Sequence, residues 1–229
     1  MCGIVGELRY GRSTVAEEFD FARLIDLMAR RGPDDAGYWA DERCRLGFRR
    51  LAILDLSSAA NQPMLAGDRY ALVYNGELYN FKELRAELER LGVVFRTRGD
   101  SEVVLHALIH WGRDALARFT GMFALGFYDA RRGTLLLARD HLGIKPLYVL
   151  EANEGLLFAS QYDQLLAHPW SATLPVSAAA LAIYFRRGYV PAPYGLLERT
   201  SMVEPGSWLE ASAAGDVARG RYYTFPVHA

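Results

Sequence analysis

Few cysteines, few lysines and no secretory leader set the first limits on this chain of 229 residues. Only Cys2 and Cys44 carry thiols, and the N-terminus lacks the basic head and apolar run of a signal peptide. The two thiols are therefore expected to stay reduced, in the cytoplasm. No CxxC pair and no cluster of histidine and cysteine occurs, so the sequence predicts no metal site.

Charge and hydrophobicity exclude further classes of protein. The longest apolar stretches, around 121–128 and 178–185, are far shorter than the about 20 residues of a membrane helix. The 26 basic and 27 acidic residues nearly balance, which gives no electrostatic reason to expect a nucleic acid or an anionic membrane as partner. Neither of the two lysines, Lys82 and Lys145, follows a glycine, so a Gly-Lys-Ser/Thr phosphate loop is absent.

The hydrophobic pattern predicts a mixed α and β domain. Alternation predicts strands at 2–10, 38–40, 44–56 and 70–74, the last ending in Asn75-Gly76, and again at 122–128, 135–139, 147–150 and 156–159. Helical spacing predicts helices at about 19–28, 80–91 and 101–118, followed by short ones at 161–167 and 177–185. Two sheets with helices outside would bury all these apolar faces. Residues 2–173 are expected to form the core, and 174–229 a C-terminal extension.

Cys2 is the first residue that suggests chemistry. Removal of Met1 would free the α-amino group of Cys2, whose ordinary pKa of about 7.7–8.0 suits it to take the thiol proton. Nucleophile and base would then belong to one residue. The plainer alternative is a buried apolar cysteine on the first strand.

A second group of polar residues could complete such a site. Asn75 and the backbone N–H of Gly76 could stabilise the oxyanion of an attacked amide, although Asn-Gly is also a common turn. Alternation places either Arg49 or Arg50 inward, where a guanidinium group needs a carboxylate. Asp100 could bind an ammonium group or cap the helix that follows it, and Glu77 is equally ambiguous.

Seven ordered motifs resemble the class II glutamine amidotransferases, in the version of the glutamine-hydrolysing asparagine synthetases. The resemblance runs from Cys2 to Ser160 and weakens toward Tyr222-Tyr223. Its motifs are Cys2-Gly3-Ile4-Val5-Gly6, Arg31-Gly32-Pro33-Asp34, Arg50-Leu51-Ala52-Ile53-Leu54-Asp55, 74–80, Gly99-Asp100-Ser101-Glu102, Gly121-Met122-Phe123-Ala124 and 139–148.

The resemblance implies an α+β fold of the N-terminal-nucleophile hydrolases, a four-layer αββα sandwich with two antiparallel sheets between helix layers. It implies that Cys2 attacks the side-chain amide of L-glutamine, that a thioester forms on Cys2 and that ammonia is released. Roles for the other residues follow in the same way: Asn75 and Gly76 as the oxyanion hole, Arg50 for the substrate carboxylate, Glu77 and Asp100 for its ammonium group, and the backbone of Ile53 and Leu54 as pocket lining. Arg31–Asp34 would organise the site.

Some features depart from the family pattern. Phe48, Gln161 and Tyr223 replace a usual histidine, glutamate and tryptophan, and no Ser-Gly-Gly pyrophosphate loop is present. The synthetase unit, with its ATP and Mg²⁺, is therefore expected in the continuation of the polypeptide or on a separate chain, and a homodimer remains open. Two alternatives also stay open: a non-catalytic or regulatory module of the same fold, and an N-terminal-cysteine hydrolase of another amide.

Overall fold

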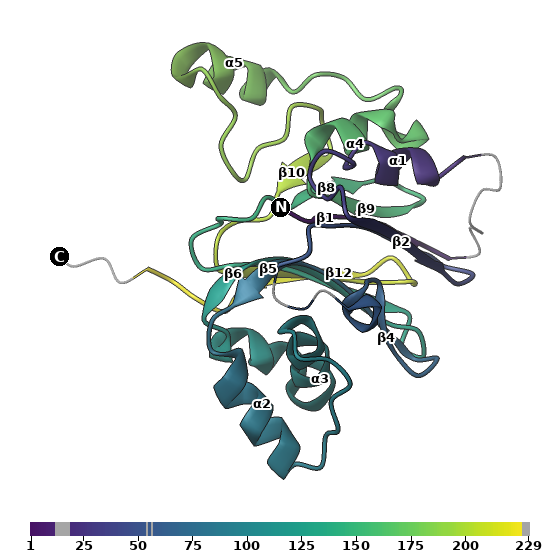
Figure 1. The fold of residues 1–229 in the computed structure, drawn as a ribbon. Coiled ribbons are helices and arrows are strands. Elements are labelled where there is room, and N and C mark those ends of the chain that lie inside the picture. The colour runs from purple at the N-terminus through teal and green to yellow at the C-terminus, as the bar shows by residue number, and fades with distance from the viewer. Residues whose placement is uncertain (12–18, 54, 56, 226–229) are drawn as a thin grey trace.

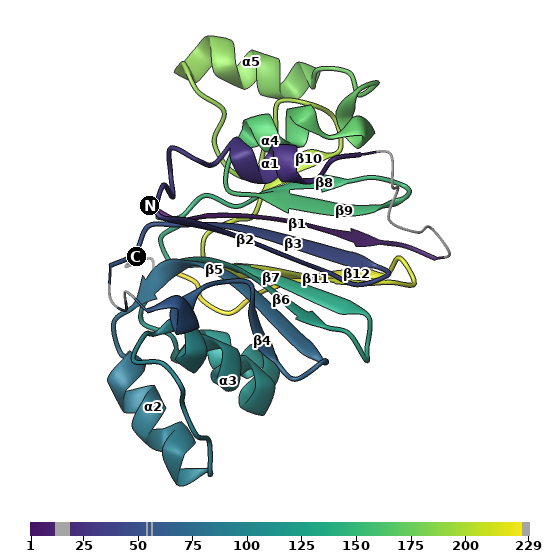
Figure 2. The same ribbon diagram turned by 45° about the vertical axis from the view of Figure 1, so that its right-hand side comes forward.

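Two antiparallel sheets lie face to face at the centre of the molecule (Figures 1 and 2). The computed structural model describes residues 1–11, 19–53, 55 and 57–225. Within that part of the chain each sheet has six strands. The predicted architecture, two antiparallel sheets between helix layers, is confirmed.

The first sheet, sheet A, contains the N-terminal strand near its middle. Its spatial order is β10-β8-β9-β1-β3-β2. The strands are β1 (Gly3–Arg9), β2 (Asp35–Ala40), β3 (Cys44–Arg50), β8 (Tyr148–Glu151), β9 (Gly155–Ala159) and β10 (Thr200–Met202).

The second sheet, sheet B, is built largely from the middle of the chain. Its order is β12-β11-β7-β6-β5-β4. The strands are β4 (Met64–Ala66), β5 (Tyr70–Leu78), β6 (Gly121–Asp129), β7 (Thr134–Arg139), β11 (Ser207–Ser212) and β12 (Val217–Arg221). The segment after residue 174 thus adds β10 to sheet A and β11 and β12 to sheet B.

Helices cover the outer faces of both sheets. Those on the side of sheet A are α1 (Ala22–Asp26), α4 (Tyr162–Ala167) and α5 (Ala178–Arg187), whereas α2 (Phe81–Arg90) and α3 (Ser101–Trp111) lie on the side of sheet B (Figure 1). Three short 3₁₀ segments accompany them: Ser58–Ala60, Gly112–Arg118 and Pro169–Ser171.

Alternating side chains sort the core into three layers. On β1, Ile4 and Leu8 point into the space between the sheets, while Val5 faces α1 and α4. On β5, Val73 faces sheet A and Tyr74 packs with α2 and α3. The period of two within each strand therefore explains why both faces of each sheet are apolar.

Three predicted elements end at other residues than expected. The strand expected at 44–56 stops at Arg50, because residues 51–53 leave the sheet, and Ile53 is 59% exposed. Asn75 and Gly76 do not form a turn but lie inside β5, paired with β6. The helix expected at 101–118 ends at Trp111, since Gly112 adopts a left-handed φ of 57°.

Candidate active site

One cavity of about 360 Å³ brings most of the predicted site residues together. It opens beside the start of β1 and the ends of β3 and β5. Leu54 lies outside the described residues, and all the other predicted residues line the cavity. They are Cys2, Arg50, Ile53, Asn75, Gly76, Glu77 and Asp100.

Strand alternation explains why these side chains converge. Residues two positions apart on a strand face the same side of the sheet. Cys2 is therefore on the side of the inward-facing Ile4, and Arg50 is on the side of the inward-facing Phe48. The antiparallel register pairs Gly3 with Arg49, so continuing it by one residue sets Cys2 opposite Arg50. Asn75 has the parity of Val73, which faces sheet A. Local pleating therefore directs polar residues from both sheets into one space.

The Cys2 thiol is half-buried and held by backbone groups. The Leu51 N–H donates to Sγ at 3.4 Å, and Sγ lies 3.5 Å from the Leu51 carbonyl oxygen. Burial raises the pKa of the Cys2 thiol, whereas the Leu51 N–H and the nearby charges of the N-terminal amine, Lys145 and Arg50 act in the lowering direction. The thiol thus needs positive charge or a base to ionise.

Asn75 presents an amide group without a partner. Its Nδ2 is buried and has no hydrogen-bond acceptor among the described residues. A buried N–H donor left unpaired costs free energy, so natural proteins rarely keep one unless a ligand completes it. Since Asn75 lines the same cavity as Cys2, the unused N–H groups are available to an oxygen atom placed there.

The Gly76 N–H points the same way as two bonded neighbours. Tyr74 N–H donates to Gln62 Oε1 at 2.6 Å, and Leu78 N–H donates to Asp100 Oδ2 at 2.8 Å, so neither is used by β6. Alternate residues of a strand direct their N–H groups to the same side, which turns the Gly76 N–H toward the cavity. A side chain at Gly76 has no room, because its Cβ would lie 2.5 Å from the Met122 carbonyl oxygen.

Asp100 occupies the N-cap position of α3, but its side chain does not cap the helix. No cap bond of its side chain is found at α3, and Oδ2 instead accepts from Leu78 N–H and, at 3.1 Å, from Tyr74 Oη. Burial raises the pKa of Asp100, and the hydrogen bonds from Leu78 and Tyr74 only partly oppose that rise. Glu77 also lines the cavity, and its carboxylate has no hydrogen bond or ion pair among the described residues. The cavity therefore contains a carboxylate that a positively charged group could pair with.

Of the two neighbouring arginines, Arg50 is the one that lines the cavity. Its Nη1 donates to Ser57 O at 3.0 Å and to Asn61 Oδ1 at 2.5 Å, and its Nη2 donates to Asp55 O. Within the described part of the chain, Nε–H has no acceptor, so the side of the guanidinium group that carries Nε keeps a donor for a carboxylate. Arg49 points the other way and pairs with Asp26.

The Arg31–Asp34 segment is hydrogen-bonded to the backbone on two sides of the cavity, at Cys2 and at Ala52. Arg31 Nε donates to the Cys2 carbonyl oxygen at 3.1 Å, and Asp34 Oδ2 accepts from Ala52 N–H at 2.8 Å. The backbone passes so close to β3 that a Cβ on Gly32 would lie 2.4 Å from Arg49. The segment therefore holds both the strand that follows Cys2 and the loop that follows β3.

Three further residues lie at the site, although the sequence assigned none of them a role there. Gln62 pairs with both backbone groups of Tyr74, accepting from its N–H and donating to its carbonyl oxygen at 3.1 Å. Phe48, at the position where the family pattern has histidine, also lines the cavity, as does Lys145. Only the burial of a polar Gln beside Pro63 could have hinted at Gln62, and a single sequence does not reveal burial.

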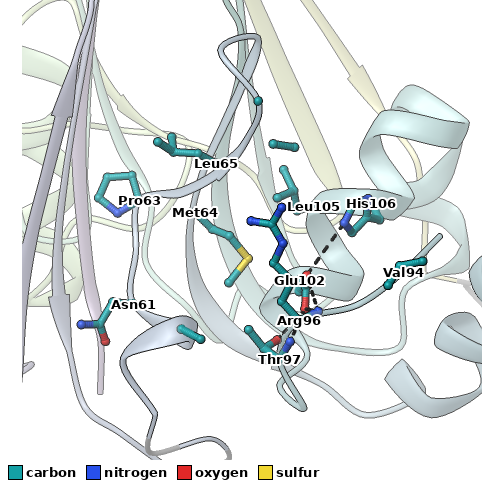
Figure 3. Close-up of a pocket in the computed structure, with 13 residues that line it drawn as sticks. Asn61, Pro63, Met64, Leu65, Val94, Arg96, Thr97, Glu102, Leu105 and His106 are labelled. Carbon is teal, nitrogen blue, oxygen red and sulfur yellow. Dashed lines mark hydrogen bonds and ion pairs between the residues drawn. The ribbon is translucent and has the colours of Figure 1, made fainter.

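A second cavity, of about 460 Å³, lies between β4 and α3 (Figure 3). Its polar wall is Glu102, whose carboxylate accepts from Arg96 N–H, Thr97 N–H and Thr97 Oγ1 at 2.7–3.0 Å. Because this carboxylate is bound by several protein donors, it fixes the segment that leads to Asp100.

No group of three or more His, Cys, Asp or Glu side chains in the described part of the chain could hold a metal ion. Among the same residues, no helix has the length and apolar character needed to cross a membrane.

Comparisons with known proteins identify the family of the chain. Asparagine synthetase [glutamine-hydrolyzing] 1 of Bacillus subtilis is 35% identical over 227 residues, which is 97% of this chain and 35% of that protein. Asparagine synthetase [glutamine-hydrolyzing] 3 of the same organism is 39% identical over 172 residues, 74% of this chain and 28% of that protein. The chain thus spans about a third of the length of these relatives.

Solved structures share the fold. The glutamine phosphoribosylpyrophosphate amidotransferase of B. subtilis superposes with a TM-score of 0.70 at 19% identity, over 98% of this chain and 50% of that one. A glutamine aminotransferase class-II domain protein from Silicibacter pomeroyi gives 0.52 at 17% identity, over 96% of this chain and 98% of that one. The family model of the glutamine amidotransferase domain matches residues 1–223. This chain therefore belongs to the class II glutamine amidotransferases.

Proposed function

We propose that this chain hydrolyses the side-chain amide of L-glutamine through a thioester on Cys2. The observation that carries the proposal is the unpartnered Nδ2 of Asn75 in the cavity of Cys2. A nucleophile beside unused N–H donors is the arrangement that acyl transfer requires, because charge develops on the oxygen of the attacked amide.

The chemistry begins once Met1 is removed, since the nitrogen of Cys2 otherwise belongs to a peptide bond. The freed α-amine takes the thiol proton, and Sγ attacks the side-chain carbonyl carbon of glutamine. Asn75 Nδ2 and the Gly76 N–H stabilise the oxyanion. The C–N bond then breaks, the amine passes the proton to the leaving ammonia, and water hydrolyses the thioester to glutamate.

The charges around the cavity suit an α-amino acid. The free edge of Arg50 would receive the α-carboxylate, while Glu77 and Asp100 would bind the ammonium group. The backbone around Ile53 and Leu54 would line the remaining side. Because both ends of glutamine's backbone meet opposite charges, the site should reject amides that lack the amino acid group.

The released ammonia would pass to an ATP-dependent amide-forming unit of the asparagine synthetase type. This proposal rests on the relatives' names, since they are glutamine-hydrolysing asparagine synthetases and are about three times as long as the match. ATP and Mg²⁺ would be bound by that unit and not by the residues of this cavity.

Glutamate release from purified protein tests the proposal. Loss of Met1 is first confirmed by intact mass, and the protein is then incubated with L-glutamine, L-asparagine or a γ-amide that lacks the α-amino group. We expect glutamate from glutamine alone, and a quenched acyl adduct on the Cys2 peptide. Cys2→Ala should abolish both, whereas Cys44→Ala, which removes the fully buried second thiol, should retain them.

Three results would contradict the proposal. Cleavage of another amide in preference to glutamine would indicate a different hydrolase. Binding of glutamine without turnover, even with the synthetase unit present, would indicate a regulatory module. Full activity of Cys2→Ala would refute the thioester mechanism.

A further inference from the structure

Lys145 is a buried cation that nothing in the proposed chemistry uses. Only 6% of the residue is exposed, and it lines the cavity that holds Cys2. Its ammonium group has no hydrogen bond or ion pair among the described residues. A cation that lines the cavity and is not bound by another protein group is available to act on a group placed there.

The loop that carries Lys145 is held by two buried side chains. Asp140, which is fully buried, accepts from the N–H groups of Phe123, Leu142, Ile144 and Lys145 at 2.9–3.2 Å. Arg139 donates to the carbonyl oxygens of Gly143, Lys145 and Val203 at 2.6–2.7 Å. Asp140 thus binds the N–H groups of the loop, and Arg139 binds its carbonyl groups. Together they fix the Lys145 backbone at the cavity.

Other charged groups also face this space, from several elements. Their signs are mixed, so the field at Cys2 depends on where each one lies. The groups that line the cavity are Arg50, Asp55, Glu77 and Asp100, together with Met1 and the ionisable Tyr74. Arg31 does not line it, but its Nε donates to the Cys2 carbonyl oxygen, and its charge also interacts with the thiol. Of the two cavity-lining cations that favour the Cys2 thiolate, Arg50 is already bonded to three acceptors of the loop that follows β3, whereas Lys145 is not.

We propose that Lys145 is a positioning residue for the nucleophile: its charge favours the Cys2 thiolate and disfavours protonation of the Cys2 α-amine. Both effects follow from one cation placed near an acid and a base. A positive charge stabilises the sulfur anion, and it repels a second positive charge on the amine. The reactive pair, a neutral amine beside a thiol ready to ionise, is thereby kept available at neutral pH. The idea deepens the proposed function and rests on it for the role of Cys2.

The pH dependence of Cys2 alkylation tests this inference without glutamine. Met1-free protein is treated with iodoacetamide across pH 5–10, and the modified Cys2 peptide is measured by mass spectrometry. For Lys145→Met we expect the midpoint of the rate profile to rise by about one pH unit, with roughly tenfold slower labelling at pH 7. Lys145→Arg, which keeps the charge, should remain close to the parent.

Lys82→Met is the matched control, because the other lysine of the chain is exposed on α2. It should leave the profile unchanged. Lys145→Gln replaces the methionine variant if thermal unfolding shows that the latter is not folded. A midpoint in folded Lys145→Met or Lys145→Gln within about 0.2 unit of the parent would overturn the inference. A shifted midpoint in a protein that never hydrolyses glutamine would instead refute the proposed function and leave this role of Lys145 standing.

Discussion

The Asp55 carboxylate accepts a hydrogen bond of 3.0 Å from the backbone N–H of Arg98, a residue 43 positions further along the chain. Its other oxygen accepts from the Ser57 N–H at 2.9 Å. The bond joins the loop after β3, which holds the Arg50 guanidinium group, to the segment that ends in Asp100. Two segments proposed to bind opposite ends of one substrate are thus fastened to each other.

Asp55→Ala should therefore weaken glutamine binding more than it slows the chemical step. We expect KM to rise about tenfold with kcat changed less than threefold, because the lost bonds orient Arg50 and Asp100 and do not touch the thiol. Steady-state glutamate release measures both constants. Asp68→Ala, an exposed carboxylate near β4, is the control. A fall in kcat with constant KM would contradict this role.

The same carboxylate should stay ionised in acid. Hydrogen bonds from the Ser57 hydroxyl and from the backbone N–H groups of Arg98 and Ser57 lower the pKa of Asp55 to about 2. A lowered pKa in the folded protein means that the stabilisation is complete above the ordinary value and disappears only as the pH falls toward 2. The hydrogen bond between Asp55 and Arg98 should thus persist at any pH where glutamine hydrolysis can be assayed.

Asn75→Ala should lower kcat by about 10²–10³ with little change in KM. The reason is that the Nδ2 donor is proposed to bind the oxyanion, which exists only in the transition state and the tetrahedral intermediate. Asn75→Asp has nearly the same shape but removes the donor, so it should be at least as harmful. Pre-steady-state acylation of Cys2 gives the most direct measurement. Equal losses in glutamine affinity and in kcat would instead indicate a general collapse of the cavity.

Asp100 should give kcat/KM an acid limb at higher pH than an ordinary aspartate would. Burial raises the pKa of this carboxyl, with the hydrogen bonds from Leu78 and Tyr74 opposing in part, and only the ionised form can bind an ammonium group. Activity should therefore fall as the pH drops through this raised value. For stability the sign is reversed, because the folded state retains its proton longer and loses stability as the pH rises through the same interval. Asp100→Asn should remove the acid limb together with most of the affinity, and a limb that persists unchanged would show that another group titrates.

Local pattern predicted much of this fold but not the contacts that complete the site. Alternation predicted the first strand, and the structure shows that the inward parity of Ile4 and Leu8 is also that of Cys2. The strand predicted at 70–74 was too short, because pairing with β6 continues through Asn75 and Gly76 and overrides the turn preference of that dipeptide. The sequence did not predict that Gln62 and Lys145 lie at the site, because the residues around them come from strands and loops that are distant in sequence. Such pairings depend on tertiary packing, which single-sequence periodicity does not encode.

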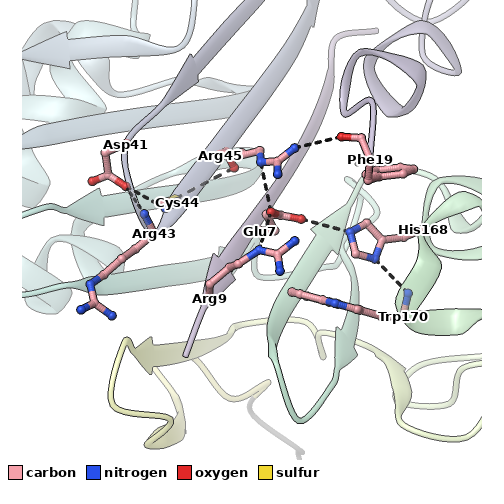
Figure 4. A network of polar contacts seen from close by, with 9 residues as sticks. All are labelled: Glu7, Arg9, Phe19, Asp41, Arg43, Cys44, Arg45, His168 and Trp170. Atoms are coloured by element: carbon pink, nitrogen blue, oxygen red, sulfur yellow. Dashed lines mark hydrogen bonds and ion pairs between the residues drawn. The ribbon is translucent and has the colours of Figure 1, made fainter. Parts of the chain in front are cut away.

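Glu7 lies at the opposite end of β1 and should be the most sensitive charged residue for stability. Its fully buried carboxylate contacts Arg9 Nε and Arg45 Nε at 3.2 Å and His168 Nε2 at 3.0 Å (Figure 4). The Trp170 N–H donates to His168 Nδ1, so the ring proton is on Nε2 and points to Glu7. Burial raises the pKa of Glu7, but the His168 bond and the two guanidinium charges together lower it below the ordinary value.

Glu7→Gln should therefore lower the free energy of unfolding by about 3–5 kcal/mol, because it removes the negative charge between two buried guanidinium groups. Chemical denaturation followed by tryptophan fluorescence measures the change. In the parent, the contribution of Glu7 is present above its unfolded pKa and is lost as the pH falls through the lower folded value, so the difference between the two proteins should shrink in acid.

The control is Glu151→Gln, which breaks the ion pair between Glu151 and Arg219. Their side chains are 35% and 52% exposed, so the loss should cost less than about 1 kcal/mol. Since the Glu7 cluster is at the far end of β1 from Cys2, any folded Glu7→Gln protein should retain the kcat of the parent, and a selective loss of kcat would show that the two ends of the strand are coupled.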